Sequence, residues 1–289
     1  MTMSTVAMAT IRRRSRRRRP PALLIASIVF LVVIVLAAIF APLIAPMNPN
    51  TTDILNASSG PSVEHWLGTD TTGRDILSRL LYGARLSLLA PLAVVILTTI
   101  VGAIVGLAAA RSGGVVDLVL SRAMDIVFAF PSLLLGLLAV AIFGPGLTAP
   151  IIALAIGYIP FLGRIVRTAT QQEQARPYIG SHIVMGFSSW WITVRHILPN
   201  IVPLLLAQAT LAFGYAMLDI AALSYLGLGV QPPAADWGSM IAQSQSAVMQ
   251  GQLWGMFWPS LAVILTVLSV NVLGEHLTDR TSARGRSLL

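Results

Sequence analysis

The stretch "MGFSSWWITVRHILPN", Met185 to Asn200, interrupts one of the most apolar parts of the chain. A glycine, two tryptophans and the basic pair Arg195–His196 precede a Leu-Pro step, with apolar runs on both sides. Of the 289 residues, 56% are hydrophobic and only 10% are charged, and the mean hydropathy is +0.80. Soluble domains carry about 25% charged residues. The composition therefore predicts an integral membrane protein that is embedded in the lipid bilayer.

The composition also excludes several kinds of site. The chain has no cysteine, so it can form neither disulfides nor thiolate metal sites. Its four histidines lack metal-ligand spacing, and all 19 basic residues are arginine, so there is no lysine for a GxxxxGK[ST] phosphate loop. The H-E-x-x-H and G-x-S-x-G motifs are absent as well. We therefore expect no enzymatic activity and no cofactor bound by this chain itself.

An arginine run, "RRRSRRRR" (Arg12 to Arg19), directly precedes the first apolar stretch. Such a run can bind nucleic acid or hold a membrane helix to the anionic cytoplasmic leaflet. The adjoining apolar run favours the membrane anchor, so no nucleic-acid partner is expected. The orientation rule for basic residues then places both termini in the cytoplasm of a multi-pass protein.

Apolar runs long enough to cross a bilayer predict six transmembrane helices. A charge-free stretch of 38 residues, Ile126 to Gly163, is too long for one crossing, and "FGPGLTAP" at Phe143 to Pro150 divides it into two helices. The predicted organisation is a basic tail at 1–20, a first transmembrane helix at 21–46, an outer loop at 47–85, a transmembrane core at 86–276 and a cytoplasmic tail at 277–289. The core contains a cytoplasmic loop at 168–196 and an outer loop at 227–253.

The outer loop at 47–85 is the exception to the charge rule, because it holds Arg74, Arg79 and Arg85. The apolar positions of "GRDILSRLLYGARL" have helical spacing. We expect an amphipathic helix that lies along the outer membrane interface.

The cytoplasmic loop at 168–196 is too long for a simple connection. Apolar residues at Ile183, Val184, Phe187 and Trp191 predict a short surface helix over Ser181–Ile192. Its polar face would be open to a partner. The alternative is a helix that only buries its tryptophans among lipid headgroups.

The stretch "VRTATQQEQARPYIGSHIVMGFSSWWITVRHILPN" resembles the cytoplasmic loop of bacterial ABC-importer permeases. That loop reads EAA, three residues, Gly, nine residues, Ile, one residue, Leu-Pro. Here the glycine and the Leu-Pro step are in place, a histidine takes the Ile position, and Gly-Ser-His replaces EAA. The resemblance implies a coupling contact with an ATPase, made by Gly180, Ser181, His182, Gly186, Arg195, His196, Leu198 and Pro199.

Three further blocks are similar to oligopeptide and dipeptide permeases of the DppC/OppC type. They read "LGTDTTGRDILSRLLYGARLSL", "GGVVDLVLSRAMDIVFAFPSLLLGLLAVAIFGPG" and "DIAALSYLGLGVQPPAADWGSMI". The resemblance implies an all-α, six-helix, type I ABC-importer permease of the bacterial inner membrane, with a cytoplasmic coupling helix, that imports di- or oligopeptides. Its implied partners are a homologous permease, two ATPase subunits that bind ATP and Mg²⁺, and an extracytoplasmic substrate-binding protein. A nickel or opine importer is the alternative within the class, and a secondary transporter is the alternative outside it.

Five residues stand out in the remaining sequence. Asp219, usually Glu in the resembled family, is expensive within an apolar stretch and marks either the substrate pathway or a pairing with arginine or water near the outer interface. Arg122 and Asp125 are spaced as an intrahelical ion pair, with a role in a gate as the alternative. Asp236 and Trp237 fall in the outer loop, where they would either dock the binding protein or line the interface.

Overall fold

The structure is a computed structural model that describes residues 21–286, and the side chains of residues 22–279. Helices account for all the regular elements in the described range, apart from one isolated bridge between Thr69 and Asp75. The elements are α1 (Pro21–Ile39), α2 (Ala41–Ile44), η1 (Ile54–Asn56), α3 (Ile76–Ser112), α4 (Gly114–Phe128), α5 (Ser132–Phe143), α6 (Thr148–Gln174), α7 (Pro177–Val184), α8 (Ser189–Ile192), the π-helical turn η2 (Thr193–Ile197), α9 (Leu198–Tyr225), α10 (Trp237–Gln243), α11 (Gln245–Met249) and α12 (Trp254–Arg286).

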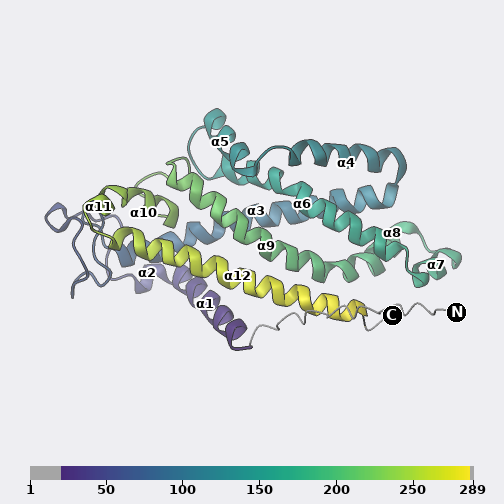
Figure 1. Ribbon diagram of the computed structural model, residues 1–289, viewed down its shortest axis with the longest axis horizontal. Helices are drawn as coiled ribbons and strands as arrows, with labels where there is room; N and C mark the ends of the chain where they lie inside the picture. Colours follow the sequence, from purple (N-terminus) through teal and green to yellow (C-terminus); the bar gives the residue numbers. More distant parts are fainter. Residues whose placement is uncertain (1–20, 287–289) are drawn as a thin grey trace, which may run out of the picture.

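The long helices run side by side, and shorter helices lie at both ends of the bundle (Figure 1). Helices α7 and α8 lie at one end, and α10 and α11 lie at the other with the irregular segment 45–75. Within the described range, five helices are long and apolar enough to cross a membrane, and the bent pair α4–α5 makes a sixth. The predicted all-α fold with six spans is therefore confirmed.

The third crossing is broken, which the sequence analysis did not predict. Helix α4 ends at Phe128, α5 begins at Ser132, and their axes differ by 78°. Pro131 stands between them, and a proline both removes a backbone donor and restricts the residue before it. The predicted division between the third and fourth crossings is present, because α5 and α6 are separate helices with residues 144–147 between them.

The expectation of a separate interfacial helix within 47–85 is wrong. Residues 76–85 are the first turns of α3, which continues without a break for 37 residues. Asp75 starts this helix, because its side chain accepts a hydrogen bond from the backbone N–H of Ser78 at 2.7 Å. Arg79, placed by the prediction on an exposed face, is only 1% exposed. At about 1.5 Å per residue, α3 is roughly 55 Å long and projects beyond a hydrocarbon core of about 30 Å.

Helices α3 and α6 pack closely because small residues line their contact. A Cβ added to Gly106 would lie 2.5 Å from the carbonyl oxygen of Gly163. About two turns earlier in α3, the Thr98 hydroxyl donates to the Ala155 carbonyl of α6 at 3.1 Å. Small residues that let two backbones approach, with a hydroxyl bonded across the contact, are typical of helix pairs in membranes. This contact makes α3 and α6 the centre of the bundle.

Candidate functional site

The segment between α6 and α9 folds into two short helices, so the single helix predicted over Ser181–Ile192 is wrong. Helix α7 ends at Val184, α8 begins at Ser189, and Gly186 stands between them with φ +83°. Gly186, one of the predicted coupling residues, thus forms a turn, and glycine suits it because left-handed backbone is costly for any residue with a Cβ.

The turn is a Schellman motif. The N–H of Gly186 donates to the Ile183 carbonyl at 3.0 Å, and the N–H of Phe187 donates to the His182 carbonyl at 3.2 Å. The rings of Phe187 and His182 lie 5.7 Å apart, which supplies the side-chain contact that accompanies this motif. Ser188 then caps α8 by accepting a hydrogen bond from the N–H of Trp191 at 3.2 Å.

An aromatic cluster holds α7 against η2. The rings of His182 and His196, two predicted coupling residues, have centroids 4.3 Å apart. Phe187 stacks on Trp191 at 4.3 Å, and Trp191 lies 5.0 Å from His196. Arg195 is exposed beside the cluster. The cluster fixes how the two short helices are oriented relative to the start of α9, where Leu198 and Pro199 form the first turn.

Glu173, at the end of α6, ties this segment to the bundle, and the sequence analysis missed it. Its buried carboxylate accepts hydrogen bonds from the Tyr178 hydroxyl and from Asn200 Nδ2 (2.9 Å), and pairs with Arg176 Nε at 2.9 Å. Burial, followed by the hydrogen bond to Glu173, raises the pKa of Tyr178 to about 12. The only sequence signal was the Glu–Arg spacing of three residues, which alone indicates a weak surface pair.

The face of α7 and α8 that is open to solvent is apolar. Val184 is 89% exposed, and Gly180 and Ser181 lie on the same open face, with no atom within 4 Å of a Cβ added to Gly180. The C-terminal end of α3 contacts α8, because Arg111 Nε donates to Ser189 Oγ at 3.2 Å. Contiguous apolar exposure of this kind suits contact with a partner protein or with lipid headgroups. The other exposed apolar side chains of the segment are Ile183, Met185, Phe187, Trp190 and Trp191.

Arginines of α6 hold the broken third crossing. The predicted pair of Arg122 with Asp125 is present at 3.4 Å, but both side chains are exposed and such pairs add little stability. Asp125 also accepts from Arg164 at 2.7 Å, and Asp117 accepts two hydrogen bonds from Arg167, at 2.5 and 2.6 Å. Sequence spacing could not reveal these contacts between helices. A gate role for Arg122 and Asp125 stays a prediction.

Asp219 lies in α9 and reaches two other helices. Its Oδ2 accepts hydrogen bonds from Ser132 Oγ at the start of α5 and from the Tyr158 hydroxyl of α6, each at 2.8 Å. Pairing with an arginine, part of one of the two alternatives, is absent among the described side chains, where two neutral hydroxyls bind the carboxylate. Its role in the substrate pathway stays a prediction.

Asp236 and Trp237 cannot dock a binding protein directly, which corrects the sequence-based expectation. Asp236 is buried and caps α10, accepting hydrogen bonds from the N–H groups of Gly238 (3.1 Å) and Ser239 (3.4 Å). Burial raises the pKa of its carboxyl. Trp237 is 0% exposed, and its Nε1 donates to the Leu80 carbonyl at 3.0 Å. The stretch is a helix start, as the Asp-x-x-Ser spacing could have indicated.

Two of the three outer arginines, Arg74 and Arg79, belong to a buried clasp between segment 45–75 and α10, whereas Arg85 Nε donates to the Ala38 carbonyl of α1 at 2.7 Å. Arg74 Nε contacts Asp70 Oδ2 at 2.7 Å, and its NH2 group donates to Gln243 Oε1 at 2.8 Å. Arg79 lies 3.5 Å from the same carboxylate. Burial alone would raise the pKa of Asp70, but hydrogen bonds from the N–H groups of Arg74 and Thr72, with the Arg74 charge, hold it below its ordinary value. These arginines are structural, which explains the exception to the charge rule.

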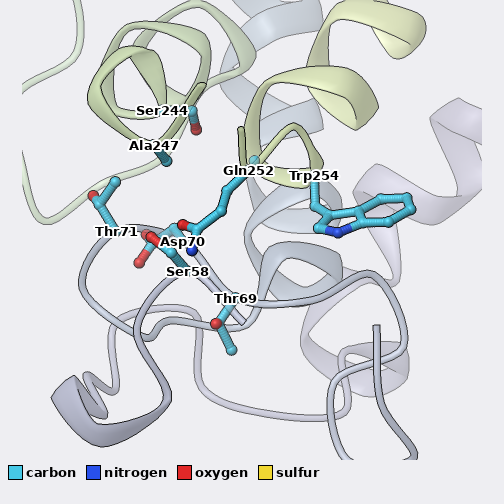
Figure 2. Close-up of a pocket in the computed structure, with 9 residues that line it drawn as sticks. Ser58, Thr69, Asp70, Thr71, Ser244, Ala247, Gln252 and Trp254 are labelled. Atoms are coloured by element: carbon cyan, nitrogen blue, oxygen red, sulfur yellow. The ribbon is translucent and has the colours of Figure 1, made fainter. Parts of the chain in front are cut away.

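A small pocket beside the clasp is too small for a substrate. Figure 2 shows Asp70 and Thr71 facing Ser244, Ala247 and Gln252 across it. Its volume is about 10 Å³, room for about one water molecule. No group of three His, Asp or Glu side chains between residues 22 and 279 is arranged to hold a metal ion.

Comparisons with known proteins agree with this geometry. Residues 99–284 match the family described as binding-protein-dependent transport system inner membrane component, and residues 12–61 match the N-terminal transmembrane domain of oligopeptide transport permease C. The chain is 41% identical to the dipeptide transport system permease protein DppC of Alkalihalophilus pseudofirmus, over 87% of this chain and 83% of the relative. It is also 41% identical to the di/tripeptide transport system permease protein DppC of Pseudomonas aeruginosa, over 84% and 82%.

Solved structures with the same fold come from the MetNI methionine ABC transporter in inward-facing conformations. One chain, with a TM-score of 0.57 and 21% identity, covers 71% of this chain and 97% of its own length. A second crystal form gives a TM-score of 0.53 at 23% identity. The likeness shows a type I importer permease fold. Because the family match spans more than half of the sequence, the chain belongs to the binding-protein-dependent transport system inner membrane components, the permease subunits of ABC importers.

Proposed function

We propose that this chain is one permease subunit of an ATP-driven importer of di- or oligopeptides in the bacterial inner membrane. The peptide cargo is supported by relatives at about 41% identity that are named for dipeptides and di/tripeptides. These names favour peptides over nickel or opines. A homologous permease would supply the other half of the pathway. The chain itself would do no covalent chemistry and bind no cofactor, because ATP and Mg²⁺ would bind to two separate ATPase subunits.

The open face of α7 and α8 is the observation that carries the proposal. It is apolar, lies at one end of the bundle and is fixed by the Schellman turn at Gly186 and by Glu173 at the end of α6 (Figure 1). An ATPase subunit would bind there, with Gly180 and Ser181 at the point of closest approach. This end, with both termini, would then face the cytoplasm.

The binding protein would dock on the opposite end, on side chains other than Asp236 and Trp237. The segment 45–75 presents strongly exposed apolar residues, with Leu55 97% exposed. Apolar side chains this exposed are anchors for a partner that approaches from outside. The others in the segment are Met47, Ile54, Val63 and Trp66.

The broken third crossing would act as the gate. Asp125 joins Arg122 of α4 to Arg164 of α6, so α4 can separate from α6 only by breaking an ion pair. Such a two-state contact is the kind of element that ligand binding shifts in transporters.

The absence of native cysteine allows a direct test with single cysteines. In the assembled transporter, Val184→Cys should crosslink to an ATPase subunit and react with a membrane-impermeant maleimide only from the cytoplasmic side. Leu55→Cys, the matched control at the other end, should crosslink to the binding protein and react only from outside. Crosslinks in the reverse pattern would refute the orientation. Wild-type proteoliposomes that fail to import peptide with ATP would refute the cargo.

A further inference from the structure

Asp219 is a carboxylate inside a membrane span, and it has no charged partner among the side chains of residues 22–279. It lies in α9, and its two hydrogen bonds come from the neutral hydroxyls of Ser132 and Tyr158. Ionisable side chains within membrane-spanning helices are rare and mark a functional site by default, and Asp219 lies in the last two turns of α9. The two hydroxyls orient the carboxylate but leave its negative charge uncompensated.

The contrast with α4 makes this lack of a cation informative. Both carboxylates of α4 are neutralised by arginines of α6, Asp117 by Arg167 and Asp125 by Arg164. The same α6 offers only a tyrosine hydroxyl to Asp219. Among the side chains described between residues 22 and 279, no basic residue pairs with Asp219. We infer that the cation that would balance it comes from outside the part of the chain that the structure describes.

The surroundings of Asp219 suit an ammonium group. Tyr215 lies one helical turn earlier on the same face of α9 and is 60% exposed, and Tyr158 binds the carboxylate itself. A carboxylate beside aromatic rings binds an organic cation by charge attraction and cation–π contact together. The hydrogen bonds in the structure use only Oδ2, so Oδ1 remains for a further donor.

The position of Asp219 also points to the pathway. The side chain is half-buried in this single chain, and ionisable groups in spans face a bundle interior or a water-filled cavity and not lipid. Ser132, one of its donors, is the first residue of α5, directly after the 78° break in the third crossing. Asp219 is thus tied to the part of the bundle where the helix is interrupted.

We propose that Asp219, with Tyr158, Tyr215 and Ser132, forms a cation subsite that takes the primary ammonium group of the cargo, the amino terminus of a peptide, during its passage. This inference rests on the proposed function, because it assumes that peptide passes along this side of α9. It adds a selectivity for charge that belongs to the permease and is independent of the binding protein.

The test uses the complete transporter in proteoliposomes with its binding protein. Uptake of a dipeptide is compared with uptake of its N-acetyl form, at equal occupancy of the binding protein, for wild type, Asp219→Asn and Asp219→Glu. Each rate is expressed relative to wild type for the same cargo, so the preference of the binding protein cancels. Loss of a hydrogen bond to a charged group is worth about ten- to a hundredfold.

The expected result is that Asp219→Asn lowers uptake of the free dipeptide at least about tenfold, leaves uptake of the N-acetyl form within about twofold, and is largely rescued by Asp219→Glu. Equal losses for both cargoes would overturn the proposal, because they would show a structural role. If the Asp219→Asn complex loses the second permease on purification, the proposal is overturned as well, because the cation that pairs with Asp219 would then belong to that subunit. If wild type imports neither cargo, the proposed function fails instead.

Discussion

Replacing Gly186 with alanine should uncouple ATP hydrolysis from import while leaving the bundle intact. The backbone at this position has φ +83°, and no atom lies within 4 Å of an added Cβ. Any effect of alanine therefore comes from the backbone and not from a clash. Left-handed geometry costs a residue with a Cβ about 1–2 kcal/mol. That energy shifts the equilibrium against the native turn by roughly 5- to 30-fold.

The consequence follows from what the turn does. It holds the angle between α7 and α8 through the two Schellman hydrogen bonds to His182 and Ile183. A changed angle moves the exposed Val184 away from the aromatic cluster that fixes the rest of the segment. We expect the number of peptides imported per ATP hydrolysed in proteoliposomes to fall several-fold, within the 5- to 30-fold limit set by the backbone cost.

Gly251 provides a matched control at the other end of the bundle. Its backbone has φ +82°, and an added Cβ there also meets no atom within 4 Å. Alanine at 251 carries the same backbone cost away from α7 and α8, so it should keep coupling normal. Gly186→Asn should retain more coupling than Gly186→Ala, because asparagine tolerates the left-handed region. Equal coupling in Gly186→Ala and Gly251→Ala, at equal subunit content, would refute the reasoning.

Three further outcomes follow from contacts elsewhere. Asp117→Arg or Arg167→Asp alone should lower the thermal stability of the complex, and the exchange of both charges should restore it; an unrestored double variant would show that the pair is not what holds α4. Trp237→Ala should cost about 3–5 kcal/mol of stability and lower the yield of folded complex, because the side chain is fully buried. A variant with normal stability but weaker affinity for the binding protein would restore the docking hypothesis. The pKa of Asp70 is depressed below its ordinary 3.8. Its stabilisation of the clasp should therefore be full at neutral pH and be lost as the pH falls through the depressed value. Melting temperatures measured from pH 6 to 3 should show this loss, and a flat profile would contradict it.

Much of the fold could be predicted from the sequence because each crossing of the bilayer needs a long apolar run. The Gly and Pro cluster at 143–150 correctly divided the charge-free stretch, and the Leu198–Pro199 step marked the start of α9. These signals are local, so they survive without knowledge of neighbouring helices.

The errors arose where a contact between distant segments decided the outcome. The amphipathic pattern around Arg79 suggests an interfacial helix. Arg79 instead lies in the first turns of α3, where Asp70 and the Pro49 carbonyl contact its buried side chain. Asp236 and Trp237 have the composition of a docking surface, and yet one caps a helix and the other fills the core. Polarity along the chain does not reveal which polar side chains find a buried partner.

Helix α6 joins the two sites that the sequence suggested separately. Its last turn carries Glu173, which accepts hydrogen bonds from Tyr178 of α7 and from Asn200 of α9. About 22 Å earlier along the same helix, at 1.5 Å per residue, Tyr158 donates to Asp219. Between these points, α6 packs on α3 without room for a Cβ at Gly106. Because a closely packed helix moves as a unit and not by local deformation, we expect a displacement of α7 and α8 to shift α6, and with it the Tyr158 hydroxyl that binds Asp219.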